Sequence, residues 1–100
     1  MPIYNLGPAN HHAAVCIARV RWLSPEMRRL LRKEGIWEDL IQQLYTAAFE
    51  AWQSGLDDLE TRRFASRRLY AFFKAYGFRL TRHGYFKREK PLESVFNFNI

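Results

Sequence analysis

The chain has 100 residues, of which 48% are hydrophobic and 16% aromatic, and it carries a formal net charge of +6 at pH 7. This composition excludes a disordered tail and suits one compact domain over residues 1–100. No stretch approaches the roughly 20 apolar residues of a membrane span, and the single cysteine, Cys16, excludes an intramolecular disulfide. Because the first residues also lack the basic head and apolar run of a signal peptide, we expect a cytoplasmic protein without membrane contact.

The N-terminal stretch predicts an irregular lead-in over residues 1–8 and then a first helix. Asn10 can cap a helix that runs to about Leu23. One face of this helix would carry four residues: Ala14, Ile17, Ala18 and Arg21. A strand is the alternative, because β-branched residues are frequent here. They are Val15, Ile17 and Val20.

A second, short helix should begin at Pro25. Ser24 before it is a good N-cap residue, and proline is tolerated at the first helical position because its missing N–H has no helical partner there. Gly35 should end this helix, since glycine accepts the left-handed backbone that closes a last turn.

The stretch from Trp37 to Gln53 has the clearest helical periodicity of the chain. Apolar residues recur at steps of three and four and predict a buried stripe: Leu40, Ile41, Leu44, Tyr45, Ala48 and Trp52. The opposite side is polar and should reach solvent or a partner. It carries Glu38, Asp39, Gln42, Gln43, Thr46 and Glu50. Gly55 should end the helix.

A fourth helix is predicted from about Asp58 to Tyr76, with Gly77 as its stop. Asp57 can cap it, and Glu60 three residues later completes an acidic capping box. One stripe of this helix should pack on the preceding helix: Ala65, Leu69, Phe72 and Tyr76.

A second stripe of the fourth helix combines cations with an aromatic ring. Its residues are Arg63, Arg67, Tyr70 and Lys74, flanked by Arg62 and Arg68. Basic groups can bind phosphates while a ring offers a stacking surface, as in proteins that bind single-stranded nucleic acid. The stripe also fits a solvated helix face with a half-buried Tyr70, and both interpretations stay open.

Positive charge is concentrated in the second half of the chain. Residues 62–100 hold ten Lys/Arg and two Asp/Glu, whereas residues 1–61 hold six and eight. Beyond Gly77, the His83-Gly84 turn signal suggests a hairpin or an extended arm over 78–100 that continues the basic surface. The arm carries Arg79, Arg82, Lys87 and Arg88, and its end is aromatic. Such asymmetry is typical of a chain that meets a polyanion, most often nucleic acid, and the alternative is a basic face that serves solubility.

An enzymatic function is not expected. The sequence lacks a G-x-S-x-G motif, a phosphate-binding glycine loop and a His-rich metal motif. His11, His12 and Cys16 lie near one another, but a zinc site normally needs four ligands and no second pair is nearby. We therefore expect structural roles for these three residues, and no cofactor or metal.

The run EDLIQQLYTAAFEAW, from Glu38 to Trp52, resembles region 2.2 of bacterial sigma factors, whose helix reads roughly D-L-[IV]-Q-E. The matching residues are Asp39, Leu40, Ile41 and Gln42, and Gln43 replaces the usual glutamate. The next helix is similar to regions 2.3 and 2.4, where an aromatic-alanine pair, here Phe64 and Ala65, precedes the segment that faces DNA. The resemblance covers about residues 36–77.

The resemblance implies two partners. In sigma factors the polar side of the region 2.2 helix docks on the clamp helices of core RNA polymerase, which implies polymerase contacts by Asp39, Gln42 and Gln43. The following helix binds the promoter −10 element and its melted strand. This implies DNA contacts by Arg62, Arg63, Arg67, Arg68, Tyr70 and Lys74. Outside the resemblance, the charge of the arm is expected to extend this DNA surface through Arg79, Arg82, Lys87 and Arg88.

Two departures limit the resemblance. Arg67 and Arg68 stand where primary sigma factors carry paired tryptophans for strand opening. A chain of this length also has no room for a helix-turn-helix that reads the −35 element, so we do not expect a complete sigma factor.

Together these observations predict an all-α fold, a small bundle of about four helices with a basic, partly extended C-terminal arm. The expected function is that of a DNA-binding, sigma-factor-like transcription module, of phage or mobile-element type. The alternative is a non-catalytic protein–protein interaction module that uses the same basic face and the aromatic C-terminal tail.

Overall fold

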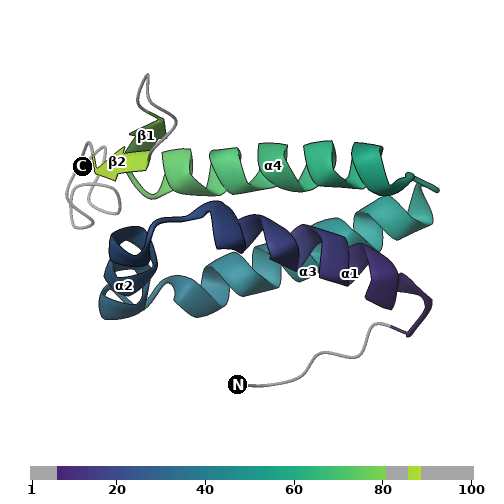
Figure 1. Ribbon diagram of the computed structural model, residues 1–100, viewed down its shortest axis with the longest axis horizontal. Helices are drawn as coiled ribbons and strands as arrows, with labels where there is room; N and C mark the ends of the chain where they lie inside the picture. The colour runs from purple at the N-terminus through teal and green to yellow at the C-terminus, as the bar shows by residue number, and fades with distance from the viewer. Residues whose placement is uncertain (1–6, 81–85, 89–100) are drawn as a thin grey trace, which may run out of the picture.

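The computed structural model describes residues 7–80 and 86–88, and this part of the chain forms four α-helices and one short β-hairpin (Figure 1). The α-helices are α1 (Asn10–Ile17), α2 (Pro25–Lys33), α3 (Trp37–Gln53) and α4 (Asp58–Ala75). Two 3₁₀ helices flank α1, η1 (Gly7–Ala9) and η2 (Ala18–Trp22), and β1 (Phe78–Leu80) pairs antiparallel with β2 (Phe86–Arg88). The predicted helical bundle is confirmed, and so is a hairpin after Gly77. His83, Gly84 and the aromatic tail lie outside the described residues.

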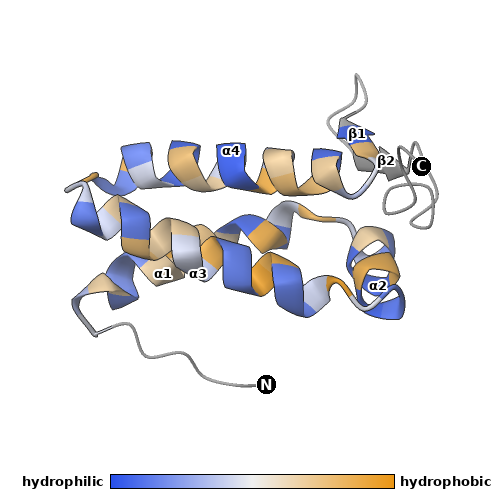
Figure 2. Ribbon diagram, turned by 180° about the vertical axis from the view of Figure 1, so that it is seen from behind, coloured by the Kyte–Doolittle hydropathy of each residue, from blue (hydrophilic) through white to orange (hydrophobic). Residues whose placement is uncertain are grey.

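Helix α4 lies over α1 and α3, and α2 crosses one end of the bundle (Figure 1). Hydrophilic and hydrophobic residues alternate along each helix, as amphipathic helices around one core require (Figure 2). No helix within residues 7–80 combines the length and the apolar character needed to cross a membrane.

The core is built where α3 meets α1 and α4, and small residues make up much of this contact. The buried residues of α3 are Leu40, Ile41, Leu44, Ala47, Ala48 and Ala51. Their neighbours in the core include Ala13 and Cys16 from α1 and Ala65 from α4. Alanines at a helix crossing let the axes approach closely, because the separation of packed helices depends on the side chains between them.

The predicted stripe on α3 was wrong at its C-terminal end. Trp52 is 36% exposed and its ring lies 5.6 Å from that of Phe49, whereas Ala51 is fully buried. Periodicity favoured the large residue, but only the small side chain of Ala51 fits the closely packed side of the helix. Tyr45 is partly buried against the core.

Helix α1 also differs from its prediction. It begins at Asn10 itself, with Ala9 at the N-cap position and no side-chain capping bond, and it gives way to η2 after Ile17. The buried side carries Ala9, Ala13 and Cys16, and Ala14 is exposed. The strand alternative is excluded. Packing against the alanines of α3 selects the smallest residues of α1, which periodicity alone did not identify.

Two of the three predicted helix caps, Ser24 and Asp57, are confirmed. The Ser24 hydroxyl accepts a hydrogen bond from the Met27 N–H at 3.1 Å, and Pro25 is the first helical residue. The Asp57 carboxylate accepts one from the Glu60 N–H at 2.8 Å. Gly55 lies between α3 and α4 with a φ of 70°, in the left-handed region where a side chain would be strained.

We predict that Asp57→Ala lowers the free energy of unfolding by about 1 kcal/mol, because the Glu60 N–H loses its acceptor at the start of α4. Urea denaturation followed by circular dichroism measures this change. The control is Asp57→Asn, which keeps an acceptor oxygen and should lose much less. Equal losses in the two variants would mean that the charge of Asp57, and not its hydrogen bond, stabilises the helix.

Candidate nucleic-acid interface

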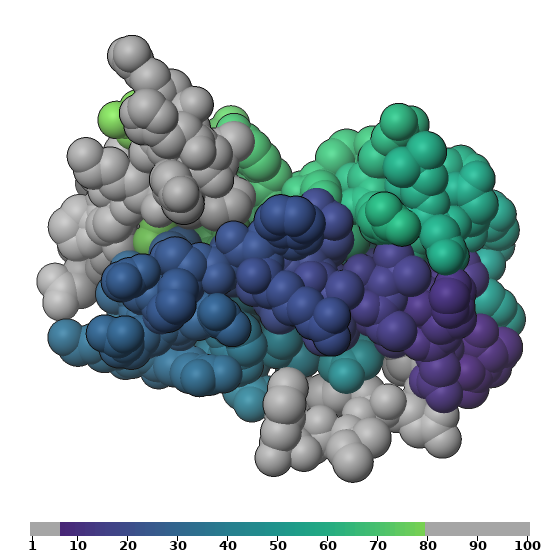
Figure 3. Space-filling view, viewed as in Figure 1, coloured from purple at the N-terminus to yellow at the C-terminus, as the bar shows by residue number. Residues whose placement is uncertain are grey.

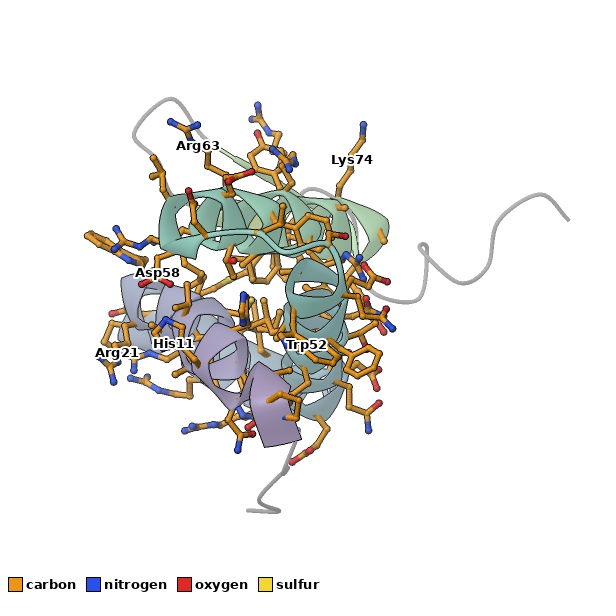
Figure 4. The ribbon with its side chains drawn as sticks, turned by 90° about the vertical axis from the view of Figure 1, so that its right-hand side faces the viewer. His11, Arg21, Trp52, Asp58, Arg63 and Lys74 are labelled. Atoms are coloured by element: carbon orange, nitrogen blue, oxygen red, sulfur yellow. The ribbon has the colours of Figure 1, made fainter. Side chains whose placement is uncertain are left out.

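The outer side of α4 carries a row of cations with one aromatic ring. The inner side is buried and consists of Thr61, Ala65, Leu69, Phe72 and Phe73. Since successive residues are about 100° apart around an α-helix, the opposite side carries Arg63, Arg67, Tyr70 and Lys74. We call these four residues the basic ridge. All four are exposed, Tyr70 to 46%. Arg63 and Lys74 point away from the bundle on the same side of α4 (Figure 4).

The ridge is positive along most of its length. The acidic residues of α4 are confined to its first turn, where Glu60 precedes Arg63 by three positions. From Arg62 to the end of the helix no carboxylate follows. Phe64 is partly buried beside the ridge, and its ring centre lies 6.0 Å from the Arg67 guanidinium. Beyond the first turn of α4, therefore, no acidic residue of this helix offsets the positive charge of the ridge.

Arg68 is turned away from the ridge and joins α4 to α3. Its guanidinium forms an ion pair with the Glu50 carboxylate and donates a hydrogen bond to the Gln43 side-chain oxygen at 3.4 Å. The side chains of Arg68 and Glu50 are 27% and 44% exposed. The structure thus gives Arg68 a contact within the bundle, which the sequence did not predict.

Burial raises the pKa of the nearby Cys16 thiol to about 11, and the charge of Arg68 opposes that rise.

The predicted polymerase contacts gather in one place. Asp39, Gln42 and Gln43 are exposed on α3 and line an open hollow of about 350 Å³ between α3 and α4. Arg68 and Tyr76 lie on its α4 side. The structure therefore brings Arg68, predicted to contact DNA, among the residues predicted to contact polymerase.

A hydrogen bond joins two residues that line this hollow. The Tyr76 hydroxyl donates to the Asp39 carboxylate at 3.0 Å. Burial, and then the hydrogen bond and negative charge of Asp39, raise the pKa of Tyr76 above its ordinary value. Both effects favour the neutral phenol, so the hydroxyl keeps the proton that it donates.

Arg62 lies on the other flank of the ridge, toward α1. It lines a second open hollow, of about 410 Å³, together with residues of α1 and η2: Ala14, Val15, Ala18, Arg19 and Trp22. Figure 3 shows the face of the molecule on which α1 and η2 lie against α4. Trp22 is 78% exposed. The sequence predicted Trp22 as apolar bulk of a continuous first helix, and its exposure was not expected because the 3₁₀ helix η2 changes the direction of the side chains.

The remaining predicted DNA contacts follow α4 in the sequence. Arg79 is exposed in β1 and pairs through its backbone with Lys87, while Arg88 pairs with Phe78. Arg82 lies outside the described residues.

The histidines connect α1 to the start of α4. The Nε2 of His11 lies 2.7 Å from a carboxylate oxygen of Asp58, and the two side chains face one another (Figure 4). His12 donates from Nε2 to the Leu56 carbonyl at 3.0 Å. Within the part of the chain that the structure describes, no three His, Cys, Asp or Glu residues come together in a way that could hold a metal ion.

Comparison of the chain with protein-family models, curated proteins and solved structures found no match.

We predict that Arg68 and Glu50 are coupled in stability. A double-mutant cycle of Arg68→Ala and Glu50→Ala, measured by urea denaturation, should give a coupling of about 0.5–1 kcal/mol, because the pair is partly exposed and screened by water. Added salt should lower this value.

The matched control for this cycle is Arg67→Ala with Glu50→Ala. Arg67 is adjacent in sequence but points to the exposed side of α4, so its coupling to Glu50 should be close to zero. Equal coupling in the two cycles would mean that Glu50 attracts the positive helix as a whole and that the pair has no specific role.

Proposed function

We propose that this protein is a DNA-binding, sigma-factor-like transcription module that presents the basic ridge to promoter or single-stranded DNA. The observation that carries the proposal is the clustering of Arg63, Arg67 and Lys74 with Tyr70 on one exposed side of a helix whose other side is anchored in the core. A rigid row of cations binds phosphates without ordering a loop first, which lowers the entropic cost of binding.

The dimensions of the ridge suit a short length of one DNA strand. Arg63 and Lys74 are eleven residues apart, which corresponds to about 16 Å along an α-helix. One strand of a duplex has a phosphate roughly every 3.4 Å along the axis, so the ridge spans about five nucleotides. Tyr70 lies between Arg67 and Lys74, where its ring can stack on an unpaired base while the cations bind the backbone.

The proposed DNA contact does not extend to strand opening. At the two positions where primary sigma factors carry paired tryptophans, this chain has an exposed Arg67 and an Arg68 that pairs with Glu50. Neither residue offers an aromatic surface that could replace the stacking of an opened base pair. We therefore propose that the module binds DNA that is already single-stranded, or a duplex through its backbone.

The second proposed partner is core RNA polymerase, through Asp39, Gln42 and Gln43. Two features support this proposal beyond the sequence resemblance. The apolar residues of the motif, Leu40 and Ile41, are buried while the polar ones are exposed. Contacts with Tyr76 and Arg68 also hold Asp39 and Gln43 in place, which reduces the conformational entropy lost when a partner docks.

One observation favours the alternative of a protein-interaction module. Phe49 and Trp52 form an exposed aromatic pair near the C-terminal end of α3, 42% and 36% exposed. Exposed apolar groups of this kind can mark protein contacts. The two functions differ in their response to DNA, which the following experiment measures.

We predict that Arg63→Glu combined with Arg67→Glu weakens DNA binding at least roughly tenfold at physiological salt, because two phosphate contacts become repulsive. Fluorescence anisotropy of labelled single- and double-stranded oligonucleotides, with and without a −10-like sequence, measures the affinity. For the unaltered protein, three ridge cations on a single strand give a loss on the order of twentyfold between 50 and 200 mM salt.

The matched control is Arg29→Glu with Lys33→Glu, two exposed cations of α2. It changes the net charge by the same amount but leaves α4 intact, so DNA affinity should fall far less. If both double variants lost the same DNA affinity, binding would depend on the overall net charge and the ridge would not be the binding surface. Absence of binding by the unaltered protein, even at low salt, would favour the protein-interaction alternative.

For the polymerase contact, we predict that Gln42→Arg weakens the capture of purified core RNA polymerase by the immobilised protein several-fold. Gln42 lines the hollow between α3 and α4, so the substitution places a bulky cation there. Gln53→Arg adds the same side chain at the exposed end of α3, outside that hollow, and should have little effect. Capture that is equal for both variants would refute this half of the proposal.

A further inference from the structure

Trp22 is the most exposed large hydrophobic residue in the described part of the chain, at 78%. It is the last residue of η2, and Leu23 directly after it is buried. The backbone beside the ring is therefore anchored in the core while the indole stands in solvent. An indole has a large apolar surface, and this one lies beside two arginines as well as small and aliphatic side chains.

Basic residues surround the ring on two elements. In a 3₁₀ helix residues three apart lie above one another, and the Arg19 guanidinium is accordingly 5.8 Å from the centre of the Trp22 ring. Arg62, from α4, lines the same hollow. Arg21, next to Trp22 in the chain, points away from the bundle (Figure 4).

The hollow beside Trp22 borders the basic ridge. Arg62 precedes Arg63 in α4 and lies about 100° further around the helix, so one edge of the hollow continues into the ridge. Its floor consists of small or aliphatic side chains of α1 and η2, namely Ala14, Val15 and Ala18. Its volume of about 410 Å³ lies in the range of small-ligand sites, roughly 300–1,000 Å³.

We propose that this hollow binds one unpaired nucleobase, stacked on Trp22, of a DNA strand whose backbone crosses Arg62 and continues along the basic ridge. The inference rests on the proposed function, and it adds a second contact region and a preference for single strands. Arg19 and Arg62 supply positive charge for the phosphates beside the base, and the aliphatic floor accepts the base without reading its identity. Duplex DNA does not use the site, because its bases are stacked on one another and have no free face.

The test compares the native chain with Trp22→Leu, which keeps apolar bulk and removes the ring. Anisotropy should give a roughly five- to twentyfold weaker affinity for a labelled single-stranded oligonucleotide, and an unchanged affinity for the duplex of the same sequence. Trp22→Phe should retain most of the binding, because a ring remains. Trp52→Leu, which removes another exposed tryptophan on α3, should have no effect.

A strand of abasic residues separates stacking from charge. It keeps the phosphates but has no bases, so the native chain and Trp22→Leu should bind it equally. Arg62→Ala should reduce the dependence of single-strand affinity on salt, lowering the slope of log affinity against log salt by about 0.7. Circular dichroism should show the same helicity for every variant, since the replaced side chains are exposed.

Three outcomes would overturn the inference. If Trp22→Leu lost the same affinity for single- and double-stranded DNA, Trp22 would support the DNA-binding surface without stacking on an unpaired base. If it lost no affinity for either, Trp22 would have no part in binding. A change in oligomeric state of Trp22→Leu, measured by sedimentation, would mean that a second copy of the chain covers the ring.

The two proposals fail in different ways. If the native chain binds DNA and charge reversal of the ridge weakens it, but Trp22→Leu does not, the stacking site alone is wrong. If the native chain does not bind either oligonucleotide, both proposals are wrong.

Discussion

The close contact of α3 with α1 and α4, through alanine side chains, is the constraint on which the rest of the structure depends. Ala47, Ala48 and Ala51 are fully buried, and the helices can approach because little side chain separates them. The core also buries large side chains such as Leu40, Leu44 and Phe73, and the interior is filled by close packing of large and small residues together. This contact fixes which side of each neighbouring helix faces inward, and it thereby fixes the side that faces solvent.

The orientation of α4 divides its cations into three groups. With Ala65, Leu69 and Phe73 turned inward, Arg63, Arg67 and Lys74 point outward, Arg62 turns toward α1, and Arg68 turns toward α3. The packing of the buried, uncharged residues of α4 thus determines in which direction each of its cations points. A substitution that rotated α4 in the core would therefore alter the surface proposed for DNA without changing a basic residue.

Local signals allowed much of the fold to be predicted from the sequence. Ser24, Asp57 and Gly55 mark helix ends through contacts with residues a few positions away, so no knowledge of the rest of the chain was needed. The exposure of the cations of the basic ridge likewise followed from helical period, whereas the exposure of Tyr70 was left open. The failures were non-local: the burial of Ala51 in place of Trp52, and the exposure of Trp22, depend on which helices meet and on the change to a 3₁₀ helix.

Charge counted along the sequence is a poor guide to the charge available to a partner. Residues 62–100 have a large positive excess, but Arg68 belongs to that half and is paired with Glu50 of the first half. Conversely, Arg19 belongs to the acidic half and lines a hollow with Arg62. Folding therefore moves one cation off the surface proposed for DNA and brings another beside it. The surface proposed for nucleic acid therefore extends over both halves of the chain, and in this proposal α1 and η2 contribute to binding as well as holding α4.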